Sequence, residues 1–284
     1  MEPERIVERI WPGRQAKLES LGGGITNRNF KVVVGGETFV LRVGGKDTEL
    51  LGIDRSTEHA ASRIAAELGL APEVVAFVEP EGYLVTRYVD GEVGKFDVGR
   101  VGAALRRLHD GPAMPGRFDS FRVVETYRII AGERGVGAPA AYERAKEVAD
   151  KIERRRRGAP LRPCHNDLLN ANFIDDGAKL WLVDWEYAGM GDPFFDLGNF
   201  AVNHELTEES EHALLAAYGS DDSDALVLMR FMSDFREAMW GVVQVAISEL
   251  DFDFGAYAEE HFERLARTAA EPRFRRAIER PARR

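Results

Sequence analysis

The sequence predicts an α+β fold in which a small antiparallel sheet comes first and helices dominate the rest of the chain. Two runs of alternating residues, 31–34 and 38–43, are separated by Gly35-Gly36 and indicate a hairpin. The apolar run 82–89 adds a further strand. Helices are indicated where apolar residues recur at intervals of three and four, over 54–68, 142–157 and 226–249.

The segment 164–173 and the short apolar run after it, 179–183, carry most of the functional information. Phosphoryl transfer needs a carboxylate that accepts the proton of a hydroxyl group and oxygen ligands that hold magnesium. Asp167 suits the first task, and Asn172 with Asp184 suits the second. An Asp and an Asn at this spacing are also common in polar turns. Because an apolar strand ending on an acid follows, the phosphoryl-transfer interpretation is favoured.

A glycine-rich turn precedes the hairpin. Gly23 and Gly24 would let backbone N–H groups approach phosphate oxygens, and Thr26 and Asn27 would add side-chain donors. Consecutive glycines also occur in turns that bind nothing. The position of this turn, between the first two strands of the expected sheet, favours a phosphate-binding role.

Arg42 lies between apolar neighbours on the second hairpin strand, so its side chain is expected on the face opposite Leu41 and Val43. A cation in such a place often reaches solvent instead of a ligand. Glu58 falls in the first turn of the following helix, where the helix dipole favours a carboxylate. We predict an Arg42–Glu58 ion pair that holds the cation against nucleotide phosphates.

These motifs, together with the segments 195–200 and 240–248, resemble the choline/ethanolamine kinase family. The resemblance is closest to its bacterial choline kinase branch, inside the aminoglycoside phosphotransferase-like superfamily, and covers about residues 20 to 265. It implies a two-lobed protein-kinase-like fold, with a small antiparallel-sheet lobe at 1–90 and a mostly helical lobe at 91–284. The implied reaction transfers the γ-phosphate of ATP, with Mg²⁺, to the hydroxyl of a small alcohol.

The resemblance also assigns a role to each motif residue. The expected roles are a catalytic base, Asp167; magnesium ligands, Asn172 and Asp184; phosphate contacts, Gly23, Gly24, Thr26, Asn27 and Arg42 with its partner Glu58; backbone contacts to adenine, Arg87 and Val89; and structural supports, His165 and Asp196. Asp196 is expected to brace the backbone of the catalytic loop, to cap a helix, or to do both.

The acceptor pocket of choline kinases combines aromatic rings with a carboxylate, so that cation–π attraction holds the ammonium group. The matching residues are expected to be Trp240, Phe252 and Tyr257, with Glu205 as a carboxylate. Each of these rings could equally pack in the core. Where relatives carry a glutamate and a second tryptophan, this chain has Asn203 and Glu237. These departures weaken the case for choline itself. The resemblance as a whole makes choline or ethanolamine the expected acceptor, with an aminoglycoside, a sugar or another small alcohol as alternatives.

The composition and length of the chain argue against several other classes of protein. The 284 residues carry a net charge of −10, which argues against nucleic acid as a partner. Cys164 is the single cysteine, and no signal peptide or apolar stretch of membrane-spanning length is evident, so we expect a cytoplasmic enzyme with no membrane partner. Only residues 185–195 separate Asp184 from Asp196, too few for the activation loop of a protein kinase. A catalytically silent ATP-binding protein would be expected to lack one of the three candidate catalytic residues. The oligomeric state stays open.

Overall fold

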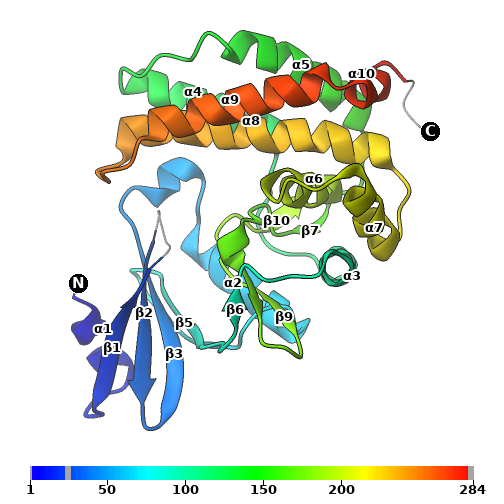
Figure 1. The fold of residues 1–284 in the computed structure, drawn as a ribbon. Coiled ribbons are helices and arrows are strands. Elements are labelled where there is room, and N and C mark those ends of the chain that lie inside the picture. The colour runs from blue at the N-terminus through cyan, green and yellow to red at the C-terminus, as the bar shows by residue number, and fades with distance from the viewer. Residues whose placement is uncertain (1, 23–26, 281–284) are drawn as a thin grey trace. The chain divides into compact units, whose positions relative to one another are not determined.

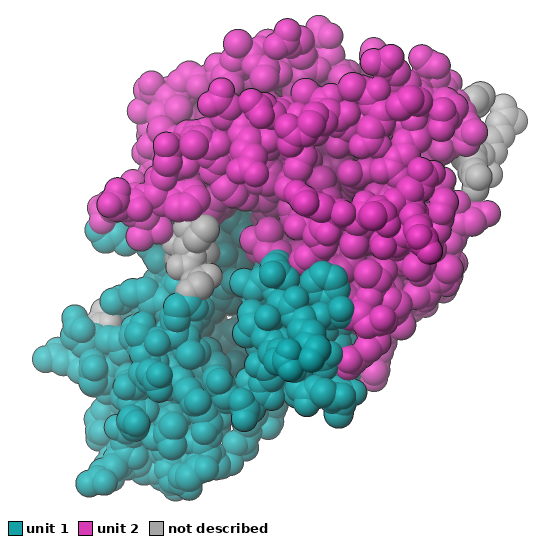
Figure 2. Space-filling model, viewed as in Figure 1, with its two compact units in different colours: residues 1–96, 170–188 teal, residues 97–169, 189–284 magenta. Residues whose placement is uncertain are grey.

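The computed structural model describes residues 2–22 and 27–280. The chain divides into two compact units, coloured separately in Figure 2. Unit 1 comprises residues 1–96 and 170–188, and unit 2 comprises residues 97–169 and 189–284. These units differ from the contiguous lobes predicted from the sequence, because the segment 170–188 packs with the N-terminal residues.

Unit 1 is built on an antiparallel sheet with the strand order β1-β2-β3-β5-β4. Its elements are α1 (Pro3–Ile10), β1 (Ala16–Leu21), β2 (Asn27–Val34), β3 (Glu37–Gly44), η1 (Thr48–Leu51), α2 (Arg55–Glu67), β4 (Val74–Val78), β5 (Tyr83–Arg87), β6 (Glu92–Val93), η2 (Asn170–Asn172), β8 (Phe173–Asp175) and β9 (Leu180–Leu182). The expected hairpin is therefore present as β2 and β3.

Alternation along β3 decides which side chains enter the core. Leu41 and Val43 are buried and join a hydrophobic cluster that includes Ile6 and Val7 of α1. Full burial of one such aliphatic side chain stabilises the fold by about 1.5–3 kcal/mol. Because neighbouring residues of a strand point to opposite faces, Arg42 lies on the other face of the sheet, as predicted.

The segment 170–188 joins unit 1 through backbone hydrogen bonds. Strands β6, β8 and β9 form a small antiparallel sheet. The N–H of Leu182 donates to the carbonyl of Leu70 at 2.8 Å, which ties β9 to the residues that follow α2. The N–H of Val183 donates to the carbonyl of Asn172 at 3.0 Å. Asn172 is thereby linked to the residue directly before Asp184.

Unit 2 is mostly helical, with one short two-stranded sheet, β10 paired with β7. Its elements are α3 (Val98–His109), α4 (Ser120–Glu133), α5 (Tyr142–Arg156), β7 (Arg162–Cys164), β10 (Gly189–Gly191), α6 (Pro193–Asn203), α7 (Glu208–Tyr218), α8 (Ser223–Ile247), α9 (Phe254–Ala270) and α10 (Pro272–Glu279). The antiparallel N-terminal sheet and the helical C-terminal region confirm the predicted fold class.

Helix α8 is the central element of unit 2. It packs against α4, α6, α9 and α10, and α9 runs along it (Figure 1). Two glycines permit the closest approaches. A Cβ at Gly198 of α6 would lie 2.5 Å from the backbone of Met229, and one at Gly241 of α8 would lie 3.0 Å from the carbonyl of Phe254. Close packing therefore fixes the registers of α6 and α9 against α8.

None of the helices in the described ranges, 2–22 and 27–280, combines the length and apolar character that a membrane span requires.

Candidate active site

The loop that carries Asp167 follows β7 and is braced by Asp196 of α6. One carboxylate oxygen of Asp196 accepts the N–H of His165 at 2.8 Å, and the other accepts the N–H of Asn166 at 2.7 Å. The cap of α6 is a different residue, Asp192, which accepts the N–H of Phe194 at 3.0 Å. Of the two predicted roles of Asp196, the structure therefore shows bracing.

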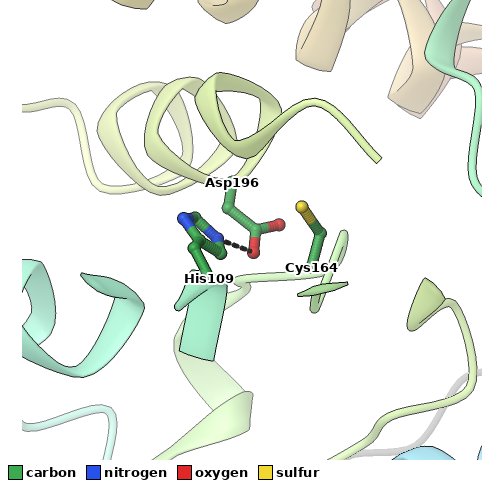
Figure 3. A group of neighbouring side chains, drawn as sticks. All are labelled: His109, Cys164 and Asp196. Atoms are coloured by element: carbon green, nitrogen blue, oxygen red, sulfur yellow. Dashed lines mark hydrogen bonds and ion pairs between the residues drawn. The ribbon is translucent and has the colours of Figure 1, made fainter. Parts of the chain in front are cut away.

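The side chain of His109 contacts Asp196 and helps to hold its carboxylate in place (Figure 3). The Nε2 atom of His109 lies 3.0 Å from Asp196 Oδ2, and its Nδ1 atom lies 3.0 Å from the hydroxyl of Tyr218. Burial, followed by the charge of nearby groups, raises the pKa of Tyr218 to about 12. The hydroxyl is thus protonated at neutral pH and can donate to Nδ1, which leaves Nε2–H to donate to Asp196.

Cys164 lies beside His109 and Asp196, and the three ligand atoms are within 4.8 Å of one another. Burial and the nearby Asp196 and Asp192 carboxylates raise the pKa of the Cys164 thiol well above its usual value. This thiol donates to the carbonyl of Arg162 at 3.3 Å, and both oxygens of Asp196 accept backbone N–H groups. The contacts of the cluster therefore support the loop.

The loop is also held at Leu168, the residue that follows Asp167. The N–H of Leu168 donates to Asn199 Oδ1 at 2.6 Å, and the carbonyl of Leu168 lies 3.1 Å from His204 Nε2. Asn166 adopts a φ of 66°, a left-handed conformation that few residues other than glycine take without support. Asp167 is 7% exposed and therefore sits in a restrained, largely desolvated position.

An ionic cluster occupies the face of the unit 1 sheet opposite the hydrophobic core. The predicted pair is present, since Arg42 Nη1 lies 2.9 Å from Glu58 Oε1. Arg42 Nη2 contacts Asp184 Oδ1, so one guanidinium joins two carboxylates. Glu58 is 2% exposed and lies in the first turn of α2, where the side chain of Asp54 caps the helix through the N–H of Thr57 at 2.7 Å.

Two residues of this cluster carried no role in the sequence analysis. Arg55 Nη1 lies 2.6 Å from Glu58 Oε2 and 3.1 Å from Glu186 Oε2. Glu186 Oε2 also accepts a hydrogen bond from Asn27 Nδ2 at 2.9 Å. Asn27, predicted to contact phosphate, is thus engaged with other side chains of the cluster. An acid two residues after Asp184 was the available signal for Glu186.

Burial and neighbouring charges both shift the pKa values of side chains in this cluster. Burial alone would lower the pKa of Arg42, but the carboxylates of Asp184, Glu58 and Glu186 outweigh it and hold the pKa above its ordinary value. Burial raises the pKa of Glu186, and the neighbouring Asp184 carboxylate raises it further. Arg42 therefore stays charged and its orientation is fixed by its partners.

A cavity of about 320 Å³ in unit 1 borders the ionic cluster. Its apolar lining includes Val40, Ala71, Leu84, Val93 and Ile174, and its polar lining includes Arg42, Asn172 and Asp184. Arg87 and Val89, the predicted adenine contacts, also line it, and the Arg87 N–H already donates to the carbonyl of Glu73 at 2.9 Å. A flat apolar base and a charged phosphate chain would find matching surfaces here.

The donor set of this cavity fits magnesium. Mg²⁺ prefers carboxylate and amide oxygens, which Asp184 and Asn172 supply. Asp184, two residues after the end of β9, adopts a φ of 68°, a left-handed conformation that is uncommon for residues other than glycine. Gly23, Gly24 and Thr26, the other predicted phosphate contacts, lie outside the described residues.

Replacing Arg42 by Lys is expected to raise the KM for ATP about 10- to 100-fold, because one charge-assisted hydrogen bond is lost. A lysine keeps the charge but cannot contact Glu58 and Asp184 through two separate nitrogens as Arg42 does. Steady-state kinetics and a thermal melt measure the effect. Arg9→Lys, in an exposed pair with Glu81, is the matched control. An unchanged KM with a lowered Tm would mean that Arg42 only stabilises unit 1.

The predicted acceptor residues of unit 2 meet where α8 and α9 pack together. The ring centroids of Trp240 and Tyr257 are 5.6 Å apart, and those of Phe252 and Tyr257 are 6.2 Å apart. Phe254, which was not predicted, joins the group with its centroid 5.7 Å from that of Trp240. Trp240 is 7% exposed and Phe252 is 47% exposed, so the cluster extends from the interior to the surface.

The carboxylate that accompanies these rings is Glu237, not Glu205. The hydroxyl of Tyr257 donates to Glu237 Oε2 at 2.9 Å, and Glu237 is 2% exposed. Glu205 is exposed and follows the end of α6 with a φ of 48°. Among the described residues, the carboxylate in contact with the ring group is that of Glu237, through Tyr257. The position that the sequence analysis treated as a lost aromatic residue therefore supplies the buried acid.

Comparison with known proteins shows that this chain is similar to phosphotransferases. The profile of the phosphotransferase enzyme family (APH) matches residues 17–232. Protein LicA of Haemophilus influenzae is 28% identical over 260 residues, which cover 83% of this chain and 75% of LicA. Ethanolamine kinase 1 of Mus musculus is 25% identical, with 91% and 85% covered. A choline/ethanolamine kinase family protein from Mesorhizobium loti has a similar structure, with a TM-score of 0.83, 31% identity and 97% of each chain covered.

Proposed function

Because this chain belongs to the phosphotransferase enzyme family and, within it, to the choline/ethanolamine kinase family, we propose that it phosphorylates the hydroxyl of a small amino alcohol with ATP. Choline and ethanolamine are the proposed acceptors. The observation that carries the proposal is the cavity of unit 1, in which Arg42, Asn172 and Asp184 line the polar end of an otherwise apolar space. Such a cavity suits a nucleoside phosphate together with a divalent cation.

Each proposed role follows from the chemistry of the side chain. Asp167, held on a braced loop, accepts the proton of the acceptor hydroxyl. Arg42 binds the phosphate chain and is oriented by Glu58. Asn172 and Asp184 hold Mg²⁺, which when bound offsets the negative charge of the phosphates. The backbone of Arg87 and Val89 faces the base of the nucleotide.

The acceptor class is supported by the aromatic cluster of α8 and α9. Aromatic faces attract an ammonium group by the cation–π effect, and Trp240 has the ring with the strongest attraction. The nearby carboxylate of Glu237 adds negative charge. Burial raises the pKa of Glu237, but the Arg236 charge and further interactions outweigh burial, so the net shift is downward and the group stays ionised at neutral pH.

An acceptor screen tests this function. Purified protein is incubated with Mg·ATP and choline, ethanolamine, an aminoglycoside or a sugar alcohol, and ADP formation is followed with each compound. We expect acceptor-dependent ADP formation with choline or ethanolamine. Turnover with an uncharged alcohol and with neither amine would refute the cationic acceptor while leaving phosphoryl transfer intact.

Replacing Trp240 by Leu is expected to raise the KM for the amino alcohol about tenfold and to leave the KM for ATP unchanged. The change keeps apolar volume but removes the ring, which is worth about 1–2 kcal/mol toward a desolvated ammonium group. Steady-state kinetics with each substrate measures the effect. Trp11→Leu, at a ring that packs on Phe39 in unit 1, is the matched control. If Trp240 only packs in the core, its replacement should lower Tm and affect both substrates alike or neither.

A further inference from the structure

A buried cation lies next to the proposed base. Arg236 of α8 is 2% exposed and is among the largest fully buried side chains of the chain. Its Nη1 atom lies 3.4 Å from Asp167 Oδ1 and also contacts Glu237 Oε1. A fully buried guanidinium is costly unless carboxylates compensate it. Here one of the two compensating carboxylates is the proposed base of the reaction.

The guanidinium is itself held in place by a second layer of contacts. Glu237 is bonded on one oxygen by Arg236 and on the other by the hydroxyl of Tyr257. Burial, with the neighbouring Glu237 carboxylate, raises the pKa of Tyr257, so that its hydroxyl remains a donor. The chain of contacts therefore runs from Tyr257 through Glu237 and Arg236 to Asp167.

Further charged groups of α8 and α9 are paired with one another. Asp234 Oδ1 accepts from Arg264 Nε at 2.6 Å and lies 3.1 Å from His261 Nδ1. His165 Nδ1 lies 3.3 Å from the N–H of Asp167 on the loop itself. Besides Asp167, the charged and titratable groups in these contacts are, on α8, Asp234, Arg236 and Glu237; on α9, Tyr257, His261 and Arg264; and on the loop, His165.

We propose that Arg236 is a positioning residue for the phosphoryl-transfer reaction, which holds Asp167 in its ionised form and fixes the direction of its carboxylate. Glu237 and Tyr257 keep the guanidinium in place and limit how much of its charge Asp167 experiences. This inference rests on the proposed function, in which Asp167 must be ionised to accept a proton. An adjacent cation favours the charged form of a carboxylate, and a nearby second carboxylate disfavours it.

Replacing Arg236 by Met tests the inference through the pH dependence of kcat/KM for the acceptor. Without the cation, the pKa of Asp167 rises, so the acid limb should move to higher pH by about 1–3 units. Activity lost at low pH should return at high pH, which a general loss of structure cannot produce. Arg236→Lys keeps a cation and should leave the limb near its wild-type position.

Arg230→Met is the matched control, because Arg230 lies on the same helix, is largely buried and pairs with Glu211 and Glu271. It should lower Tm without moving the acid limb. Glu237→Gln is expected to shift the acid limb in the direction opposite to the shift in Arg236→Met. Loss of the competing carboxylate leaves more of the Arg236 charge for Asp167, so the limb should move to lower pH.

The outcomes separate the inference from the proposed function. If the wild-type protein forms no ADP with any acceptor, the proposed function is overturned. If it turns over and the profiles of Arg236→Met and wild type coincide, the inference alone is overturned. If Arg236→Met does not fold, the double variant Arg236→Met/Glu237→Met removes both charges of the pair and is compared with Glu237→Met, so that the two proteins differ only at Arg236. Carbon-13 NMR titration of the Asp167 carboxyl, assigned with Asp167→Asn, then measures the shift without turnover; equal titrations of these two variants overturn the inference.

Discussion

Asp167→Asn is expected to lower kcat by about 10²–10⁴-fold, the usual contribution of a general base, while Mg·ATP affinity stays at the wild-type value. Asparagine preserves the shape of the side chain and can still accept a hydrogen bond from Arg236, which lies 3.4 Å from the carboxylate. It cannot take a proton from the acceptor. Steady-state kinetics and calorimetric titration of the nucleotide measure the two quantities.

The control for this substitution is Asp119→Asn, another Asp-to-Asn change within unit 2. Asp119 caps α4 by accepting the N–H groups of Phe121 and Arg122 at 3.1 and 3.2 Å. Asparagine caps helices about as well as aspartate, so stability and turnover should both be retained. If Asp167→Asn keeps most of its kcat, Asp167 is not the base.

Asp184→Ala is expected to abolish magnesium-dependent nucleotide binding, because it removes the only charged member of the proposed ligand pair. Alanine also deprives Arg42 of one partner, but Glu58 remains 2.9 Å from Arg42 Nη1, so unit 1 should stay folded. Calorimetry of nucleotide binding with and without Mg²⁺ measures the loss. Equal Mg·ATP affinity in wild type and variant would remove Asp184 from the magnesium site.

Asp184→Asn separates charge from shape in the same position. It keeps one oxygen that can face a cation and removes the negative charge, so Mg·ATP affinity should fall to a value between those of wild type and Asp184→Ala. A thermal melt of both variants checks the fold. If Asn lowers Tm as much as Ala while Mg·ATP affinity stays normal in both, the role of Asp184 is limited to pairing with Arg42.

The sequence predicted those features that depend on local periodicity. Alternation along 38–43 placed Arg42 opposite Leu41 and Val43, and the structure has it there. The position of Glu58 in the first turn of a capped helix anticipated its pair with Arg42. Periodicity placed each residue on its own element, and the resemblance to kinases supplied the pairing, because residues 45–54 with η1 lie between β3 and α2.

The sequence by itself determined the α+β fold class, the Arg42–Glu58 pair and the candidate residues Asp167, Asn172 and Asp184. Tertiary structure alone decided between bracing and capping for Asp196, put Glu237 and not Glu205 beside the aromatic rings, and brought Arg236 to Asp167. These contacts join separate segments of the chain: the loop after β7 with α6 and with α8, and α8 with α9. Burial then favours the arrangement in which charges are paired, because a buried guanidinium such as that of Arg236 is costly without compensating carboxylates.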